Sequence, residues 1–296
     1  MGELAALLTA VFWAASSIIF TFAGRRVGAP RLNRLRLIFA ILWITITHWF
    51  MRGTPLPVDA DLTRWGWLGL SGVIGLALGD LFLFTAYVNI GPRLSTLIMA
   101  SSPVMTAVLS WLLLGETLRP TQMGGIALTL SGIAWVVLER GNGSGAHLDR
   151  RTFLVGLLAG LGGAVCQTVG LLLTKQGLTG DYPSISGVAI RMIAATVTLW
   201  LAALITGQAG PTLAELRDRV TLRLMLAGSL VGPFAGIWLS LVAIQNAPVG
   251  VASTLMQISP ILLLPAGKWI FKEHISPRAV LGTLVSLAGV LVLILL

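Results

Sequence analysis

NIGPRLSTLIMASSPVMTAVLSWLLLGETLRPTQMGGIALTLSGIAWVVL, from Asn89 to Leu138, returns 157 residues later as NAPVGVASTLMQISPILLLPAGKWIFKEHISPRAVLGTLVSLAGVLVLIL, from Asn246 to Leu295. The two copies align without a gap, and most of the residues that they share are not the apolar types common to all membrane helices. The shared pairs are Asn89 and Asn246, Met99 and Met256, Ser102 and Ser259, Pro103 and Pro260, Glu116 and Glu273, Pro120 and Pro277, Gly125 and Gly282, and Gly132 and Gly289. The chain therefore contains an internal duplication.

The composition is typical of a membrane protein. Of the 296 residues, 56% are hydrophobic and 10% are charged, whereas soluble chains carry about a quarter charged residues. Many uncharged runs approach or exceed the roughly 20 residues that cross the hydrocarbon layer. The sequence predicts an all-α membrane protein with ten transmembrane helices, at about residues 4–23, 35–51, 65–88, 94–114, 121–138, 152–174, 184–206, 222–244, 249–271 and 278–296.

The ten predicted helices form two sets of five. The polar segment ERGNGSGAHLDRR separates them, which predicts a first five-helix repeat at 1–140, a linker at 141–151 and a second repeat at 152–296. An odd number of spans per half makes the repeats inverted, an arrangement typical of secondary transporters. Further matches are Ser71 and Gly228, Gly75 and Gly232, Gly79 and Gly236, and, at a shift of 155, Arg36 and Arg191. The small residues recur every four positions, so we expect close helix packing on their faces.

Charge and cysteine usage narrow the expected partners. The net charge is +9, but the basic residues lie at predicted helix ends, where they meet lipid headgroups, so we expect a lipid bilayer and no nucleic acid as partner. Fifteen Lys and Arg residues fall in the loops on one side and four on the other, which predicts that both termini lie outside a prokaryotic plasma membrane. The single cysteine, Cys166, excludes an intramolecular disulfide and a cysteine metal site, and we expect no metal or cofactor.

The duplicated stretch resembles the drug/metabolite transporter superfamily, and within it the ten-helix EamA-type family. The segments that carry the resemblance are SSPVMTAVLSWLLLGETLRPTQMGG (Ser101–Gly125) and ISPILLLPAGKWIFKEHISPRAVLG (Ile258–Gly282). The resemblance implies secondary transport by alternating access, often export of amino acids or other small metabolites. It also implies a central cavity lined mainly by the first, third, fourth, sixth, eighth and ninth helices. Many family members are thought to keep both termini inside, in contrast to the charge distribution.

The candidate substrate-binding residues lie in those six helices. Few of them are charged and several are aromatic, which suits small amphipathic or neutral solutes, although some of these positions serve packing alone. The candidates are Trp13, Ser16, Ser17, Asp80, Phe84, Tyr87, Met99, Ser102, Gln167, Trp238, Met256, Gln257 and Ser259.

Two prolines are the candidate helix breaks. Pro103 and Pro260 lie near the middle of the fourth and ninth predicted helices, where a proline removes one backbone hydrogen bond and displaces the carbonyl group four residues earlier. Those carbonyls belong to Met99 and Met256, and such breaks are tolerated where they line a cavity. The alternative is a kink for packing, with Ser102 or Ser259 capping locally.

Asp80 is the only carboxylate well inside a predicted helix, and it is the candidate proton-coupling residue. Intramembrane acids usually face a wet interior and mark proton or substrate pathways. The alternative is a structural acid that bridges to Arg36 or Arg191. We expect these two arginines to snorkel to the interface, with anion or carboxylate recognition as the other possibility. Glu116 and Glu273 are interpreted as structural residues at the starts of helices.

The sequence contains no Gly-x-Ser-x-Gly, no His-Glu-x-x-His and no nucleotide-binding loop, so we expect neither an enzyme nor an ATP-driven pump. The favoured function is secondary active export of small organic metabolites, with protons as a candidate coupling ion. The alternatives are a lipid scramblase or flippase-like protein and a receptor that does not transport. A monomer fits the sequence, and the oligomeric state stays open.

Overall fold

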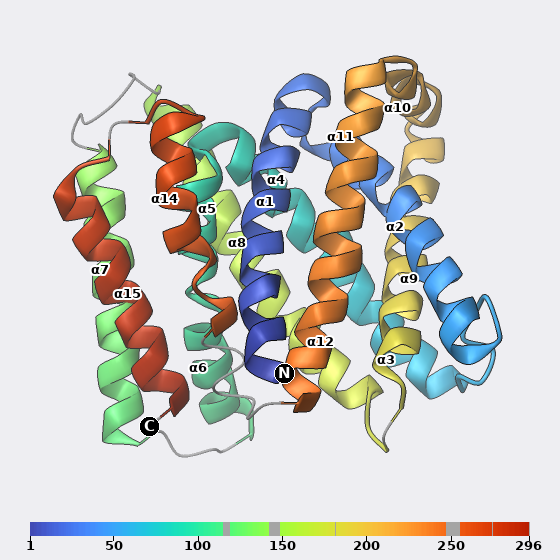
Figure 1. Cartoon of the computed structure of the whole chain (residues 1–296), viewed down its shortest axis with the longest axis horizontal. Helices are drawn as coiled ribbons and strands as arrows, with labels where there is room; N and C mark the ends of the chain where they lie inside the picture. Colours follow the sequence, from blue (N-terminus) through green and yellow to red (C-terminus); the bar gives the residue numbers. More distant parts are fainter. Residues whose placement is uncertain (115–118, 142–148, 181, 247–254, 274, 296) are drawn as a thin grey trace.

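The computed structural model describes residues 1–114, 119–141, 149–180, 182–246, 255–273 and 275–295. All regular structure in these ranges is helical, and the long helices run side by side in a bundle (Figure 1). In chain order the elements are α1 (Gly2–Val27), α2 (Ala29–Arg52), α3 (Leu62–Gly72), the π-helix η1 (Val73–Gly79), α4 (Asp80–Ile90), α5 (Pro92–Met99), α6 (Ser102–Leu114), α7 (Pro120–Gly141), α8 (Arg150–Gly177), α9 (Ser184–Ile205), α10 (Ala209–Ala214), the 3₁₀ turn η2 (Glu215–Arg217), α11 (Arg219–Ser229), the π-helix η3 (Leu230–Gly236), α12 (Ile237–Asn246), α14 (Ser259–Trp269) and α15 (Pro277–Leu295).

Eight helical segments in the described part of the chain are long and apolar enough to cross a membrane. Large apolar side chains such as Leu158, Leu201 and Leu204 are more than half exposed, which suits contact with lipid chains. The chain is therefore a multi-pass membrane protein. Two of the predicted spans, 94–114 and 249–271, are not among the eight, because α5 gives way to α6 and because residues 247–254 lie outside the described ranges.

The duplication is visible in the helix boundaries. The elements α3, η1, α6 and α7 each begin 157 residues before α11, η3, α14 and α15, respectively. The two π-helical segments therefore occupy equivalent positions. The sequence analysis predicted uninterrupted helices there. A π-helical turn contains an extra residue per turn and is frequent at functional sites, so these two turns direct attention to the middle of the bundle.

The prediction of close packing on the small-residue faces is confirmed. A side chain at Gly228, Gly232 or Gly236 would meet α1 at Phe20, Ser16 and Trp13, respectively. In the first copy, Gly79 lies against Cys166 of α8 and Gly75 against Gly170. The glycines thus bring α11 and η3 against α1, and η1 and α4 against α8.

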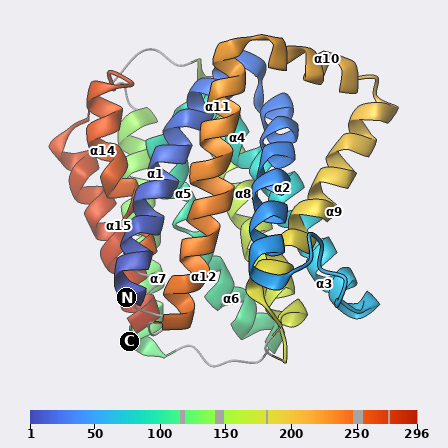
Figure 2. The ribbon, with the colours of Figure 1, turned by 45° about the vertical axis from the view of Figure 1, so that its right-hand side comes forward.

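The segment between α9 and α11 covers one edge of the bundle. Figure 2 shows α10 lying across that edge at an angle to the long helices, and α1 begins and α15 ends at the opposite edge (Figure 1). Three arginines of the first half hold the covering segment, through Arg26 to Asp218 at 2.8 Å, Arg31 to Glu215 at 2.5 Å and Arg34 to the Thr212 hydroxyl at 2.9 Å. Polar contacts therefore join the two halves at this edge.

Asp218 predicts a pH dependence of this edge. Hydrogen bonds from the Thr221 hydroxyl, the Arg26 guanidinium, and the backbone N–H groups of Thr221 and Val220 hold the pKa of Asp218 below its usual range. The resulting stabilisation is complete above the unfolded pKa, about 4, and declines as the pH falls toward the lower folded pKa. We expect the melting temperature of the wild type to fall more steeply below about pH 4 than that of Asp218→Asn. Parallel curves for the two proteins contradict this prediction.

Candidate functional site

A buried ion pair lies next to the first π-helix. Asp80, the first residue of α4, accepts a hydrogen bond from Nη2 of Arg36 in α2. The guanidinium also donates through Nη2 to the carbonyl of Leu76 at 3.3 Å and through Nε to the Asn33 side chain at 3.0 Å. The Arg36 Cζ atom lies 4.8 Å from the centre of the Phe84 ring, a cation–π geometry. Arg36 therefore has partners around much of its guanidinium.

These contacts correct one expectation and support an alternative. Arg36 is only 3% exposed, so the prediction that it snorkels to the interface is wrong: it turns inward because the carboxylate of Asp80 and the carbonyl of Leu76 lie there. The ion-paired alternative for Asp80 is observed in the structure. Its role in proton coupling stays a prediction.

Arg191 of α9 reaches the same region from the other side of η1. The backbone of Arg191 packs directly against Gly72, because a Cβ atom added to Gly72 would overlap the Arg191 carbonyl. The Nε atom is buried and has no acceptor among the described residues. The head of the side chain ends beside Gly75 of η1, so snorkelling is wrong for Arg191 as well. Its Nη2 atom lies 3.3 Å from the point that a Cβ atom of Gly75 would occupy.

Gln167 of α8 approaches that same point, with Oε1 3.9 Å away. The side chain shares a helix face with Gly163 and Gly170, which pack against η1 and α4, and lies about half a turn from the outward-facing Leu158 and Val165. Nevertheless, Gln167 is exposed. Its polar end is therefore accessible on the inner face of α8.

Aromatic and polar side chains of α1 and α4 extend the region. Phe84 packs edge-on against Phe20 with ring centres 5.3 Å apart, and Tyr87 lies 5.9 Å from Phe84. The hydroxyls of Ser16 and Ser17 donate to carbonyls of their own helix, those of Trp13 and Ala14. These two serines thus have local acceptors for their hydroxyl protons.

The two proline breaks differ in the hydrogen bonds of the serine that precedes each proline. Pro103 and Pro260 lie in the first turn of new helices, α6 and α14, where a missing N–H costs little. The hydroxyl of Ser259 donates to the Ala10 carbonyl of α1 at 3.0 Å and to the Met256 carbonyl at 3.1 Å, so it combines the local cap with a contact to α1. Ser102 instead meets the Thr168 hydroxyl of α8 at 2.9 Å.

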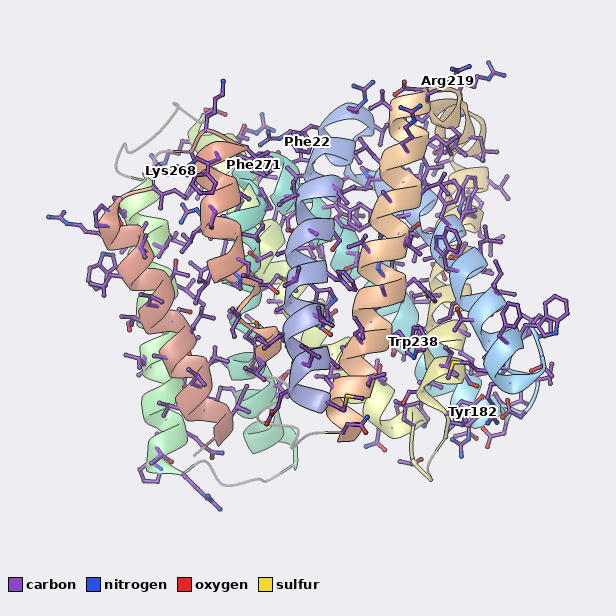
Figure 3. The ribbon with its side chains drawn as sticks, in the orientation of Figure 1. Phe22, Tyr182, Arg219, Trp238, Lys268 and Phe271 are labelled. Carbon is purple, nitrogen blue, oxygen red and sulfur yellow. The ribbon has the colours of Figure 1, made fainter. Side chains whose placement is uncertain are left out.

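The structure divides the candidates into separate groups. Asp80, Phe84 and Tyr87 lie with Arg36, while Gln167 lies near Arg191. Trp13 and Met256 share a cluster with Ala5, Ala6 and Ala243, and the sulfur of Met99 lies beside Gly163. Trp238 packs on Phe234, with ring centres 5.9 Å apart (Figure 3), and Gln257 lies in the turn before α14. Sequence reasoning did not include Arg191 among its site residues, although the duplication pointed to it.

Contacts between the halves also gather at the edge opposite the chain's first residues. Phe22 of α1 stacks on Phe271 at 5.3 Å, and Arg25 lies over the same ring (Figure 3). Nε of Arg93 in α5 donates to Glu273 at 3.1 Å, with both side chains largely buried. Glu273 thus has a structural partner in the first half, while its counterpart Glu116 lies outside the described residues.

A multi-pass helical protein with broken helices and charges in its interior has the architecture of a membrane transporter. The model of the EamA-like transporter family matches residues 1–138 and again residues 154–295. The chain therefore belongs to the EamA-like transporter family, as its resemblance to the drug/metabolite transporter superfamily predicted.

Two curated relatives match almost the whole chain. A probable terminal-alkyne amino-acid exporter of Streptantibioticus cattleyicolor is 27% identical over 291 residues, covering 98% of this chain and 92% of that protein. The uncharacterized transporter YwfM of Bacillus subtilis is 22% identical over 295 residues, covering 97% and 91%. A probable 4-amino-4-deoxy-L-arabinose-phosphoundecaprenol flippase subunit ArnE of Erwinia tasmaniensis is 35% identical over 77 residues, which is 25% of this chain and 69% of that protein.

A solved structure, titled only as the crystal structure of a protein, has the same fold. It superposes with a TM-score of 0.67 at 18% identity and covers 99% of this chain and 96% of the other. At this identity the likeness concerns the fold alone.

Proposed function

We propose that this protein is a secondary active transporter that exports small organic metabolites such as amino acids. The observation that carries the proposal is the repeated pair of broken elements, η1 with the α5–α6 break and η3 with the break before α14, around buried charges. Broken helices near the midplane expose backbone groups to a solute. The name of the exporter from Streptantibioticus cattleyicolor favours an amino acid as the solute.

We further propose ten transmembrane helices in two inverted five-helix repeats, residues 1–140 and 152–296, joined by the linker 141–151. The common shift of 157 residues between helix starts supports this arrangement. In it, α5 with α6 and the broken segment ending in α14 complete the ten spans. The charge distribution favours an orientation with both termini outside the membrane of a prokaryotic cell.

Alternating access is proposed to use the contacts between the halves. The Phe22–Phe271 stack and the Arg93–Glu273 pair hold one edge together. Their separation, coupled to closure at the other edge, would expose the interior first to one side and then to the other. Transport then needs neither ATP nor a bound cofactor.

The proposal predicts saturable solute movement by the purified protein. In sealed proteoliposomes loaded with unlabelled L-leucine, we expect external labelled leucine to accumulate by exchange, because a carrier binds solute at one site that alternately faces each side. Protein-free liposomes are the control. Rapid flipping of labelled lipid without solute exchange would favour the flippase-like alternative, for which the partial match to a flippase subunit is the supporting observation.

A further inference from the structure

We infer that Arg191 is the binding residue for a carboxylate group of the transported solute, with Gln167 as a second polar contact. The inference rests on the proposed transport function and specifies the chemistry of its site. It assigns the solute to the carboxylates, amino acids among them, and excludes amines that lack a carboxylate.

The first support is the charge balance of the interior. Arg36, Asp80 and Arg191 gather around η1, where Asp80 is bonded to Arg36 and also attracts Arg191 electrostatically. Charges inside a membrane protein are normally paired, because an isolated charge is costly away from water. The two arginines are equivalent in the duplication, but the counterpart of Asp80 is Ile237. Among the described residues, the region around η1 therefore contains two cations and one anion, and one more anion would complete it.

The second support is the unused hydrogen-bonding capacity of Arg191. A guanidinium carries five N–H donors in a planar fork that matches a carboxylate. The buried Nε of Arg191 has no acceptor in the described part of the chain, and no ion pair joins this residue to a described carboxylate within 4.0 Å. A structural arginine at this depth would be expected to have such partners, as Arg36 does.

The third support is the polarity beside the guanidinium. Residue 75 has no side chain, and the Nη2 atom of Arg191 and the Oε1 atom of Gln167 both lie within 4 Å of the point that its Cβ atom would occupy. Gln167 is exposed on the inner face of α8. Its amide can donate to a carboxylate or accept from an ammonium group, so both ends of an amino acid find a partner near η1.

The experiment compares three ligands that differ in charge: L-leucine, 4-methylpentanoate, which lacks the amine, and leucinamide, which lacks the carboxylate. Binding is measured by calorimetry on the purified full chain. We expect the wild type to bind leucine and 4-methylpentanoate but not leucinamide. Arg191→Gln should lower the binding affinity for leucine and for 4-methylpentanoate by about 10- to 100-fold, the effect of losing a charged hydrogen-bond partner. Arg219→Gln, which removes an exposed arginine at the start of α11 (Figure 3), should change neither affinity.

The melting temperature of the variants separates a solute-binding role of Arg191 from a structural role. Arg191 forms no ion pair with a described carboxylate, and the burial of its charge outweighs its electrostatic attraction to Asp80. Arg191→Gln without ligand should therefore melt no lower than the wild type. Arg191→Lys keeps the positive charge but loses the paired N–H donors of the guanidinium, so we expect an affinity for carboxylates between those of the wild type and Arg191→Gln. The inference is overturned if Arg191→Gln binds both carboxylates as the wild type does, if leucinamide binds as tightly as leucine, or if Arg191→Gln unfolds. A wild type that moves no solute would instead contradict the proposed transport function.

Discussion

Replacing Asp80 by asparagine is expected to destabilise the protein by about 3–5 kcal/mol, the usual cost of removing one partner of a buried ion pair. The change leaves the Arg36 side chain, which is 4% exposed, without a counter-charge. It also leaves Arg191 in the same region, so two cations would then lie around η1 with no anion among the described residues there. Unfolding in detergent, followed by circular dichroism at increasing temperature or denaturant, measures the loss.

The double variant Asp80→Asn with Arg36→Gln is the internal control, because it removes both charges of the pair. We expect it to recover most of the lost stability, since a buried pair contributes little over neutral partners. Asp59→Asn is the matched surface control. Asp59 pairs with Arg52 at 3.6 Å with both side chains exposed, and such pairs contribute about 0–1 kcal/mol. An Asp80→Asn protein as stable as Asp59→Asn would contradict the buried-pair interpretation.

The same double variant tests proton coupling by Asp80. If Asp80 carries the coupled proton, the variant should exchange solute but fail to concentrate it against a gradient when a pH difference is imposed. Accumulation with the same pH dependence as the wild type would exclude Asp80 as the coupling site. The two outcomes are distinguishable only in a variant that folds, which is why the pair is changed together.

The second large effect is expected where α7 crosses α15. A Cβ atom at Gly132 would overlap the backbone nitrogen of Ser286 and the carbonyl of Gly282, and one at Gly289 would overlap the backbone of Thr129. Gly132→Val therefore has to push the helices apart. We expect a loss of about 3 kcal/mol or more, because overpacking that moves backbone exceeds the usual 1–3 kcal/mol.

Gly124→Val is the matched control for Gly132→Val. It makes the same substitution in the same helix, but no atom of the described residues lies within 4 Å of an added Cβ atom, so only the small difference in helix propensity remains. Detergent-solubilised melting curves of the two variants give the comparison. Equal curves would show that the crossing at Gly132 is not tight in solution.

Patterns within the sequence predicted much of the architecture. The gap-free duplication predicted which elements correspond, and η1 and η3, α6 and α14, and α7 and α15 do begin at equivalent positions. The four-residue spacing of small residues predicted the close packing of α11 and η3 on α1. The family assignment is confirmed, while the ten-span, two-repeat arrangement stays a prediction.

The candidate site was less predictable from the same patterns. Asp80 stood out because one acid among apolar residues is visible in any sequence, and its pairing with Arg36 or Arg191 was among the alternatives. The inward course of both arginines was not predicted, since a basic residue near a helix end usually reaches the interface. Nor were the π-helical turns, because an extra residue in a turn leaves no periodic signal in a run of Gly, Ala, Val and Leu.

By itself, the sequence determined that this chain spans a membrane many times, that it is duplicated, and that Pro103 and Pro260 interrupt two of its helices. Those properties depend on composition and on local backbone chemistry, which act within one segment. Only the tertiary structure decided that Arg36 forms an ion pair with Asp80 and that the Nε of Arg191 has no acceptor in the described part of the chain. Which of two equivalent arginines meets the single acid depends on how α2, α9 and η1 are rotated and offset against one another. That rotation and offset are set by contacts between segments far apart in the chain, such as Gly72 against the backbone of Arg191.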